Sequence, residues 1–162
     1  MIKKCGFSLL EMILVIVLTV ILTGAVFLVY LTGFRVYNAG EDRSNLRTEM
    51  FLALEEITRI VTGANNIVLE SANRLKATQG TTVYRFYLYN IGDPVPSYDQ
   101  NSYDLRKSVD DETYGSGATL ATAVQPNVFS YNDSDKIVTV DLTATKNNTT
   151  VHMRTKIKPR NL

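Results

Sequence analysis

The sequence is poor in the residue types from which most enzymatic sites are built. Its 162 residues include one cysteine and one histidine, which excludes clustered His and Cys metal ligands and internal disulfide bonds. Tryptophan is absent. Lysine plus arginine number 17 and aspartate plus glutamate 16, so a net charge of +1 creates no overall field for nucleic acid or an acidic substrate. These absences argue against a soluble cytosolic enzyme.

Charge is also missing from one long segment near the N-terminus. Between Glu11 and Arg35 lie 23 consecutive uncharged residues, most of them Ile, Leu, Val or Phe. A helix of that length spans roughly 34 Å, enough to cross a bilayer core of about 30 Å. Lys3 and Lys4 precede the segment, and the positive-inside rule places them in the cytoplasm and the chain after Arg35 outside it. We predict a single-pass protein of the inner (cytoplasmic) membrane.

The residues before the apolar segment form a distinctive pattern. They read Lys-Lys-Cys-Gly and then Phe-Ser-Leu-Leu-Glu-Met, so that one acid, Glu11, lies just inside an apolar helix. An acid in a membrane helix costs a few kcal/mol and needs a partner. Cleavage after Gly6 would create one, the free α-amino group of Phe7. At roughly 4 Å and an effective dielectric of about 20, their attraction is about 4 kcal/mol before the cost of desolvation is subtracted.

This pattern resembles the leader of a type IV prepilin, in which a basic leader is cut after Gly, Phe becomes the N-terminus and Glu is the fifth mature residue. The resemblance implies cleavage between Gly6 and Phe7 by a prepilin peptidase and N-methylation of Phe7. It implies an assembly contact between Glu11 and the N-terminal amine of a neighbouring subunit, which sets the axial register of the subunits rather than adding net stability. It also implies, as partners, other pilin or pseudopilin subunits and an inner-membrane assembly platform with its ATPase. The alternative is a plain membrane anchor that is never cut.

A helical pattern continues beyond the apolar segment. Apolar residues recur at steps of three or four, at Leu46, Met50, Leu54, Ile57 and Val61. Gly63, followed by two asparagines, is a stop signal. We therefore predict one helix from about Phe7 to Thr62, which follows a leader of residues 1–6, spans the membrane over 7–34 and is amphipathic over 35–63.

From about Asn66 the periodicity changes to two, which predicts a globular antiparallel β-sheet domain over 64–162. An Asn147-Asn148 turn sets the register of the last hairpin, with Asp141 opposite Arg154 and Leu142 opposite Met153. The predicted fold class is α+β, a long N-terminal helix packed on an antiparallel sheet, as in pilins. The predicted strands are Ile67–Glu70, Thr82–Asn90, Leu105–Val109, Val128–Tyr131, Lys136–Thr145 and Thr150–Ile157.

A basic stripe occupies every second position near the C-terminus, at His152, Arg154, Lys156, Lys158 and Arg160. Residues at this spacing share one face of an extended strand. A solvated outer face with Arg154 paired to Asp141 is the favoured interpretation, and a surface for DNA, lipid headgroups or an acidic partner subunit is the alternative. Nothing nearby resembles a base-stacking platform, so nucleic acid is not an expected partner.

Asp110, Asp111 and Glu112 crowd one loop, and carboxylates are calcium ligands. The loop lacks the spacing of a recognised calcium cage, so a solvated loop is favoured over a metal site. No phosphate loop, dinucleotide fingerprint or catalytic constellation is present in the sequence. We expect neither a cofactor nor an enzymatic activity.

The sequence thus predicts a structural subunit, a minor pilin or pseudopilin that is assembled into or at the tip of a filament. Its ending resembles the J-type pseudopilin of type II secretion or the W-type minor pilin. A major pilin and a competence (DNA-uptake) pseudopilin remain open within the class. Outside the class, the alternative is a membrane-anchored periplasmic or extracellular binding module that is not polymerised.

Overall fold

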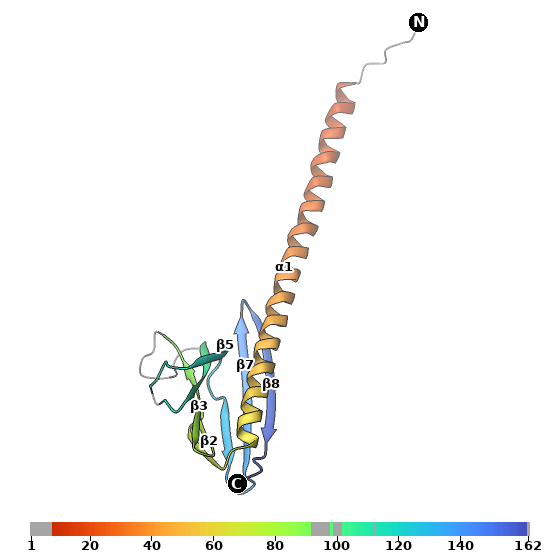
Figure 1. Ribbon diagram of the computed structural model, residues 1–162. Helices are drawn as coiled ribbons and strands as arrows, with labels where there is room; N and C mark the ends of the chain where they lie inside the picture. The colour runs from red at the N-terminus through yellow and green to blue at the C-terminus, as the bar shows by residue number, and fades with distance from the viewer. Residues whose placement is uncertain (1–7, 92–97, 99–101, 112, 162) are drawn as a thin grey trace. The chain divides into compact units, whose positions relative to one another are not determined.

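The computed structural model describes residues 8–91, 98, 102–111 and 113–161. Helix α1 (Leu9–Thr62) is followed by an antiparallel sheet, an α+β fold as predicted (Figure 1). The chain divides into two compact units, Met1–Gly40 and Glu41–Leu162, and α1 runs through the division. The strands are β1 (Asn66–Ser71), β2 (Arg74–Gln79), β3 (Thr82–Tyr89), β4 (Tyr103–Val109), β5 (Ala118–Val124), β6 (Phe129–Asn132), β7 (Ile137–Lys146) and β8 (Thr149–Ile157).

The sheet follows the order β1-β2-β3-β4-β5-β7-β6, and β8 pairs with the other side of β7. The long strand β7 meets β5 near one end, through Val124 and Ala144, and β6 near the other. The sheet curls, because the amide of Phe129 at the start of β6 donates to the carbonyl of Ala72 in the β1–β2 turn (2.7 Å). That closure brings the first and last parts of the domain together.

The second half of α1 covers the inner face of this sheet (Figure 1). Leu46, Met50, Ile57 and Val61 of the predicted apolar stripe are buried, and Leu54 is partly buried at its margin. Sheet residues opposite them, such as Phe86, are fully buried as well. The helix ends where predicted. The C-terminal tail satisfies the last helical carbonyl, since the amide of Arg160 donates to the Thr62 oxygen at 3.1 Å.

The predicted last hairpin is confirmed in register. Asn147 and Asn148 have φ values of 47° and 63°, the left-handed conformation that a tight two-residue turn needs. Asp141 lies opposite Arg154 and Leu142 opposite Met153. Alternate residues of β7, including Val138 and Leu142, therefore point into the core.

Two strands were not predicted from the sequence. Strand β2 has only Leu75 and Ala77 as apolar residues on its buried face, and β5 consists mostly of Ala and Thr. Both lie inside the sheet, where small residues pack as well as the large β-branched ones that mark a strand in sequence. The other strands match prediction to within two residues at each end, and the helix begins at Leu9 among the described residues.

Candidate functional site

The N-terminal candidate site is visible only from Ser8 onwards. Gly6 and Phe7, the predicted processing residues, lie outside the described residues. Glu11 is in the first turn of α1, where its amide and that of Met12 donate to the Ser8 carbonyl at 3.0 and 3.2 Å. A negative side chain is favoured there by the helix dipole. No cation in the described part of the chain lies within 4 Å of the Glu11 carboxylate.

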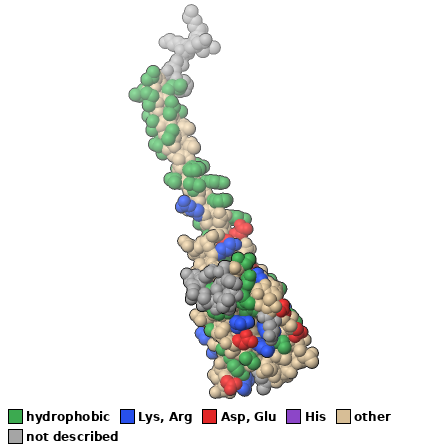
Figure 2. Space-filling model, turned by 90° about the vertical axis from the view of Figure 1, so that its left-hand side faces the viewer, with side chains coloured by type: hydrophobic (Ala, Val, Ile, Leu, Met, Phe, Trp, Pro, Cys, Tyr) green, Lys and Arg blue, Asp and Glu red, His purple; other side chains and the backbone are tan. Residues whose placement is uncertain are grey.

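The part of α1 that follows Glu11 is apolar around its whole circumference. Most large apolar side chains between Leu9 and Tyr37 are exposed, each with 51% to 79% of its surface accessible. Figure 2 shows hydrophobic side chains along this part of the helix. The segment is long and apolar enough to span a membrane. Soluble monomers rarely expose a continuous apolar surface of this size, which is compatible with a membrane-spanning segment.

Hydroxyl groups in this apolar stretch bond back to the helix itself. The side chains of Thr19, Thr23 and Thr32 donate to backbone carbonyls four residues earlier, at 2.7 to 2.9 Å. Each hydroxyl proton is therefore satisfied without water, which is the arrangement that an apolar environment requires.

In the second unit, three acids of α1 anchor one flank of the helix to the sheet. They lie seven residues apart. Asp42 accepts from Asn147 (2.9 Å) in the β7–β8 turn, and Glu49 accepts from the Thr122 hydroxyl (2.8 Å) of β5. The hydrogen bond from Asn147, aided by the charge of Lys146, lowers the pKa of Asp42.

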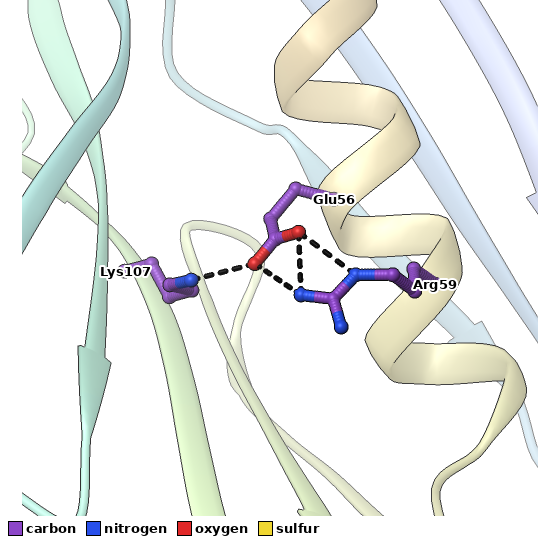
Figure 3. A network of polar contacts seen from close by, with 3 residues as sticks. All are labelled: Glu56, Arg59 and Lys107. Atoms are coloured by element: carbon purple, nitrogen blue, oxygen red, sulfur yellow. Dashed lines mark hydrogen bonds and ion pairs between the residues drawn. The ribbon is translucent and has the colours of Figure 1, made fainter.

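Glu56 makes the third and strongest of these contacts (Figure 3). Its carboxylate lies 2.6 Å from the Lys107 ammonium group of β4 and also accepts from the Arg59 guanidinium at 2.7 to 3.0 Å. The side chains of Glu56 and Lys107 are 22% and 21% exposed, so water screens their attraction only partly. The Lys107 hydrogen bond, followed by that of Arg59, lowers the pKa of Glu56. The sequence alone did not predict these contacts, because Glu56 and Lys107 lie 51 residues apart.

The acidic loop contains carboxylates that accept hydrogen bonds from backbone amides. Asp110 accepts from the Val83 amide at 2.7 Å, and the Asp111 carboxylate accepts from the Thr113 amide at 2.8 Å. The latter bond holds the pKa of Asp111 below its ordinary value. Glu112 lies outside the described residues, and within the described part of the chain no three His, Cys, Asp or Glu side chains are grouped to hold a metal ion.

The basic stripe is exposed along its whole length. Arg154 and Lys156 lie on β8, which ends at Ile157, so Lys158 and Arg160 follow the strand. Asp141 lies 3.7 Å from Arg154, the predicted partner, and 2.5 Å from the diagonal neighbour His152, which the sequence analysis did not pair with it. The stripe therefore has one paired end and one end of unpaired lysine and arginine among the described residues.

The fold is that of an α+β protein. Its long helix α1 is apolar and long enough to span a membrane, and the sheet domain packs on the second half of that helix. The chain matches no family model, no curated protein and no solved structure.

Proposed function

We propose that this protein is a structural subunit of the type IV filament class, a minor pilin or pseudopilin. The single observation that carries the proposal is Glu11, a lone acid in the first turn of α1, followed by 23 uncharged residues and standing fifth when Phe7 is counted as the first residue after Gly6. A solitary acid at this place costs free energy unless a cation meets it. The N-terminal amine of a neighbouring subunit, once residues 1–6 are removed, is such a cation.

The chain's role in this proposal is mechanical. It is inserted in the inner membrane with its N-terminus in the cytoplasm, cut by a prepilin peptidase and methylated at Phe7. An assembly platform with its ATPase then extracts it into a pilus or pseudopilus, where the apolar half of α1 packs against the same segment of its neighbours. The exposed apolar surface of residues 9–37 supports this step, since it is suited to lipid and to helix packing alike.

The first experiment is the intact mass of the N-terminal peptide from cells with and without prepilin peptidase. We expect a peptide that begins at methylated Phe7 and disappears when the peptidase is absent. A peptide that begins at Met1 in both strains would refute the proposal and leave a membrane-anchored binding module.

A second experiment tests Glu11 itself. The Glu11→Ala variant should still be inserted and cut, but should not enter filaments or support secretion or piliation. Glu41→Ala is the matched control, because it removes an exposed acid from the same helix outside the apolar stretch. Full assembly of Glu11→Ala would exclude the register role of the acid.

A further inference from the structure

The outer edge of β8 has no neighbouring strand in the described part of the chain, since β8 pairs with β7 alone. The orientation of its backbone groups follows from β7. The Thr143 carbonyl accepts from Gln125 (2.8 Å) and the Asp141 amide donates to Val128 (2.8 Å), so both residues direct these groups away from β8. Directly opposed residues of an antiparallel pair behave alike. Their partners His152 and Arg154 therefore direct their amides and carbonyls away from β7, to the open edge.

The same positions carry the positive charge of the stripe. Lys156, opposite Thr139 and two residues beyond Arg154, shares its backbone orientation. The side chains of His152, Arg154 and Lys156 are exposed, while Val151 and Ile157, which flank them in sequence, are buried. Lys156 has no acidic partner within 4 Å among the described residues, and one carboxylate, Asp141, serves the other two. Open hydrogen-bonding groups and unbalanced positive charge thus coincide along one edge.

Helix α1 adds positive charge on the other face of this edge. Arg43 and Arg47 line a groove of about 330 Å³ whose opposite wall is β8, from Thr150 to Met153. Neither guanidinium lies within 4 Å of an acidic side chain in the described part of the chain. On the other flank of the same helix, Asp42, Glu49 and Glu56 all bind the sheet. The two arginines without an acidic partner among the described residues, Arg43 and Arg47, thus lie on the flank beside β8.

We infer that the open edge of β8 is the docking site for an extended acidic segment of a partner polypeptide, which adds a strand to the sheet. A polypeptide backbone alternates donors and acceptors at the spacing that His152, Arg154 and Lys156 present. One face of the added strand would meet Arg154 and Lys156, and the other would meet Arg43 and Arg47. A second copy of β8 is disfavoured at this edge, because like charges would lie opposite one another. The inference does not depend on filament assembly.

Fluorescence anisotropy with the full chain in uncharged detergent micelles tests the site. The probe is a labelled peptide of about ten residues of Glu, Thr and Val, with glutamates on both faces of the extended strand. We expect saturable binding that weakens with salt and fails when lysine replaces glutamate. N-methylation of alternate amides, which removes edge hydrogen bonds but keeps every charge, should weaken binding by about tenfold or more.

Variants locate the site on the chain. The Arg154→Glu/Lys156→Glu variant should lose about tenfold or more in affinity. Lys156→Pro should also weaken binding, because it removes an outward amide that the β7 ladder does not use. Lys76→Glu on the interior strand β2 is the matched control and should bind as the parent does. In the parent chain, hydrogen exchange at the amides of His152 and Arg154 should slow when the peptide is added.

Three outcomes would overturn the inference. The first is the absence of saturable binding. The second is that the N-methylated and unmethylated peptides bind with equal affinity and that hydrogen exchange at His152 and Arg154 does not slow. That result would mean that β8 carries only a charged patch, of the kind that binds lipid headgroups or nucleic acid. The third is a dimer of the full chain that Lys156→Pro dissociates, which would assign the edge to a second copy.

Discussion

Replacing Glu56 by glutamine should show that one ion pair fixes α1 against β4. The carboxylate lies 2.6 Å from Lys107, and both side chains are about a fifth exposed, at 22% and 21%. Charge-assisted hydrogen bonds contribute about 1.5–3 kcal/mol, whereas fully exposed ion pairs contribute about 0.2–1 kcal/mol. Allowing for the remaining exposure, we expect a Glu56–Lys107 coupling of about 1–2 kcal/mol. Arg59 binds the same carboxylate but is 68% exposed, so its coupling should be clearly smaller than that of Lys107.

Two double-mutant cycles measure these couplings. One combines Glu56→Gln with Lys107→Met, and the other combines Glu56→Gln with Arg59→Met. Urea unfolding of the full chain in micelles, followed by near-ultraviolet circular dichroism of the packed tyrosines, gives the free energy of unfolding of each variant. Equal couplings in the two cycles would refute the argument that burial decides which contact stabilises the domain.

The same pair gives a pH dependence with a definite sign. Lys107 and then Arg59 lower the pKa of Glu56 from its ordinary 4.5. The ionised carboxylate therefore contributes its full stabilising free energy at pH values above 4.5. It is lost as the pH falls through the lower folded pKa. The difference in free energy of unfolding between the parent chain and Glu56→Gln should therefore shrink as the pH is lowered from about 5 to about 3. A difference that stays constant over this range would contradict the assigned partners.

Further stability predictions use the same urea assay. Ile57→Ala removes a fully buried side chain of α1 and should cost about 2–5 kcal/mol, whereas Leu52→Ala, at a position 56% exposed on the same helix, should cost about 0.5 kcal/mol or less. Gly117→Ala should cost at least about 2 kcal/mol, because φ is +97° and a Cβ would meet the β4 backbone. The control Gly80→Ala, with φ of +64° and open space, should cost about 1 kcal/mol. Asn148→Val should cost about 1 kcal/mol, since a β-branched residue resists the observed φ of 63°, while Asn148→Gly should be tolerated.

The parts of the fold that the sequence predicts are those with strong periodicity. The stripe from Leu46 to Val61 repeats for four turns, which suffices to identify a helix and its buried face. The last hairpin is predicted in register because the Asn147-Asn148 turn and the alternation of β7 and β8 agree independently. Strand β5 was not predicted, because its Ala and Thr residues differ little in hydrophobicity and give only a weak apolar–polar alternation.

Burial on both faces of β3 could not be predicted either. Arg85 and Tyr87 point to the outer face, yet they are 8% and 3% exposed. The loop after β4 folds back over them, and its carbonyls at Asp111 and Ser116 accept from Arg85 and Tyr87 respectively. A loop that supplies its own polar cover has no signature in local periodicity, because it depends on contacts between residues far apart in sequence.

The candidate sites divide in the same way. Glu11 stands out in sequence because it is a lone acid in an apolar run, so one residue and its spacing are enough. The open edge of β8 does not stand out. The stripe from His152 to Arg160 shows that charges share a face, but only the topology shows that β8 is the last strand on its side of β7. Sheet order depends on long-range pairing, so the free edge becomes visible only in the folded domain.

The distribution of charge around α1 supports a binding role for the basic stripe of β8, in addition to exposure to solvent. Exposed basic residues commonly protect a sheet edge from pairing with another chain. Protection alone would require charge only on the edge strand. Here Arg43 and Arg47, which pair with no acidic side chain among the described residues, add charge from the helix on the face that β8 turns toward the core. A strand beside β8 would meet cations on both faces, an arrangement that repels a basic strand and favours an acidic strand over a neutral one. The edge is thus closed to copies of itself by the same residues that leave it open to an acidic segment.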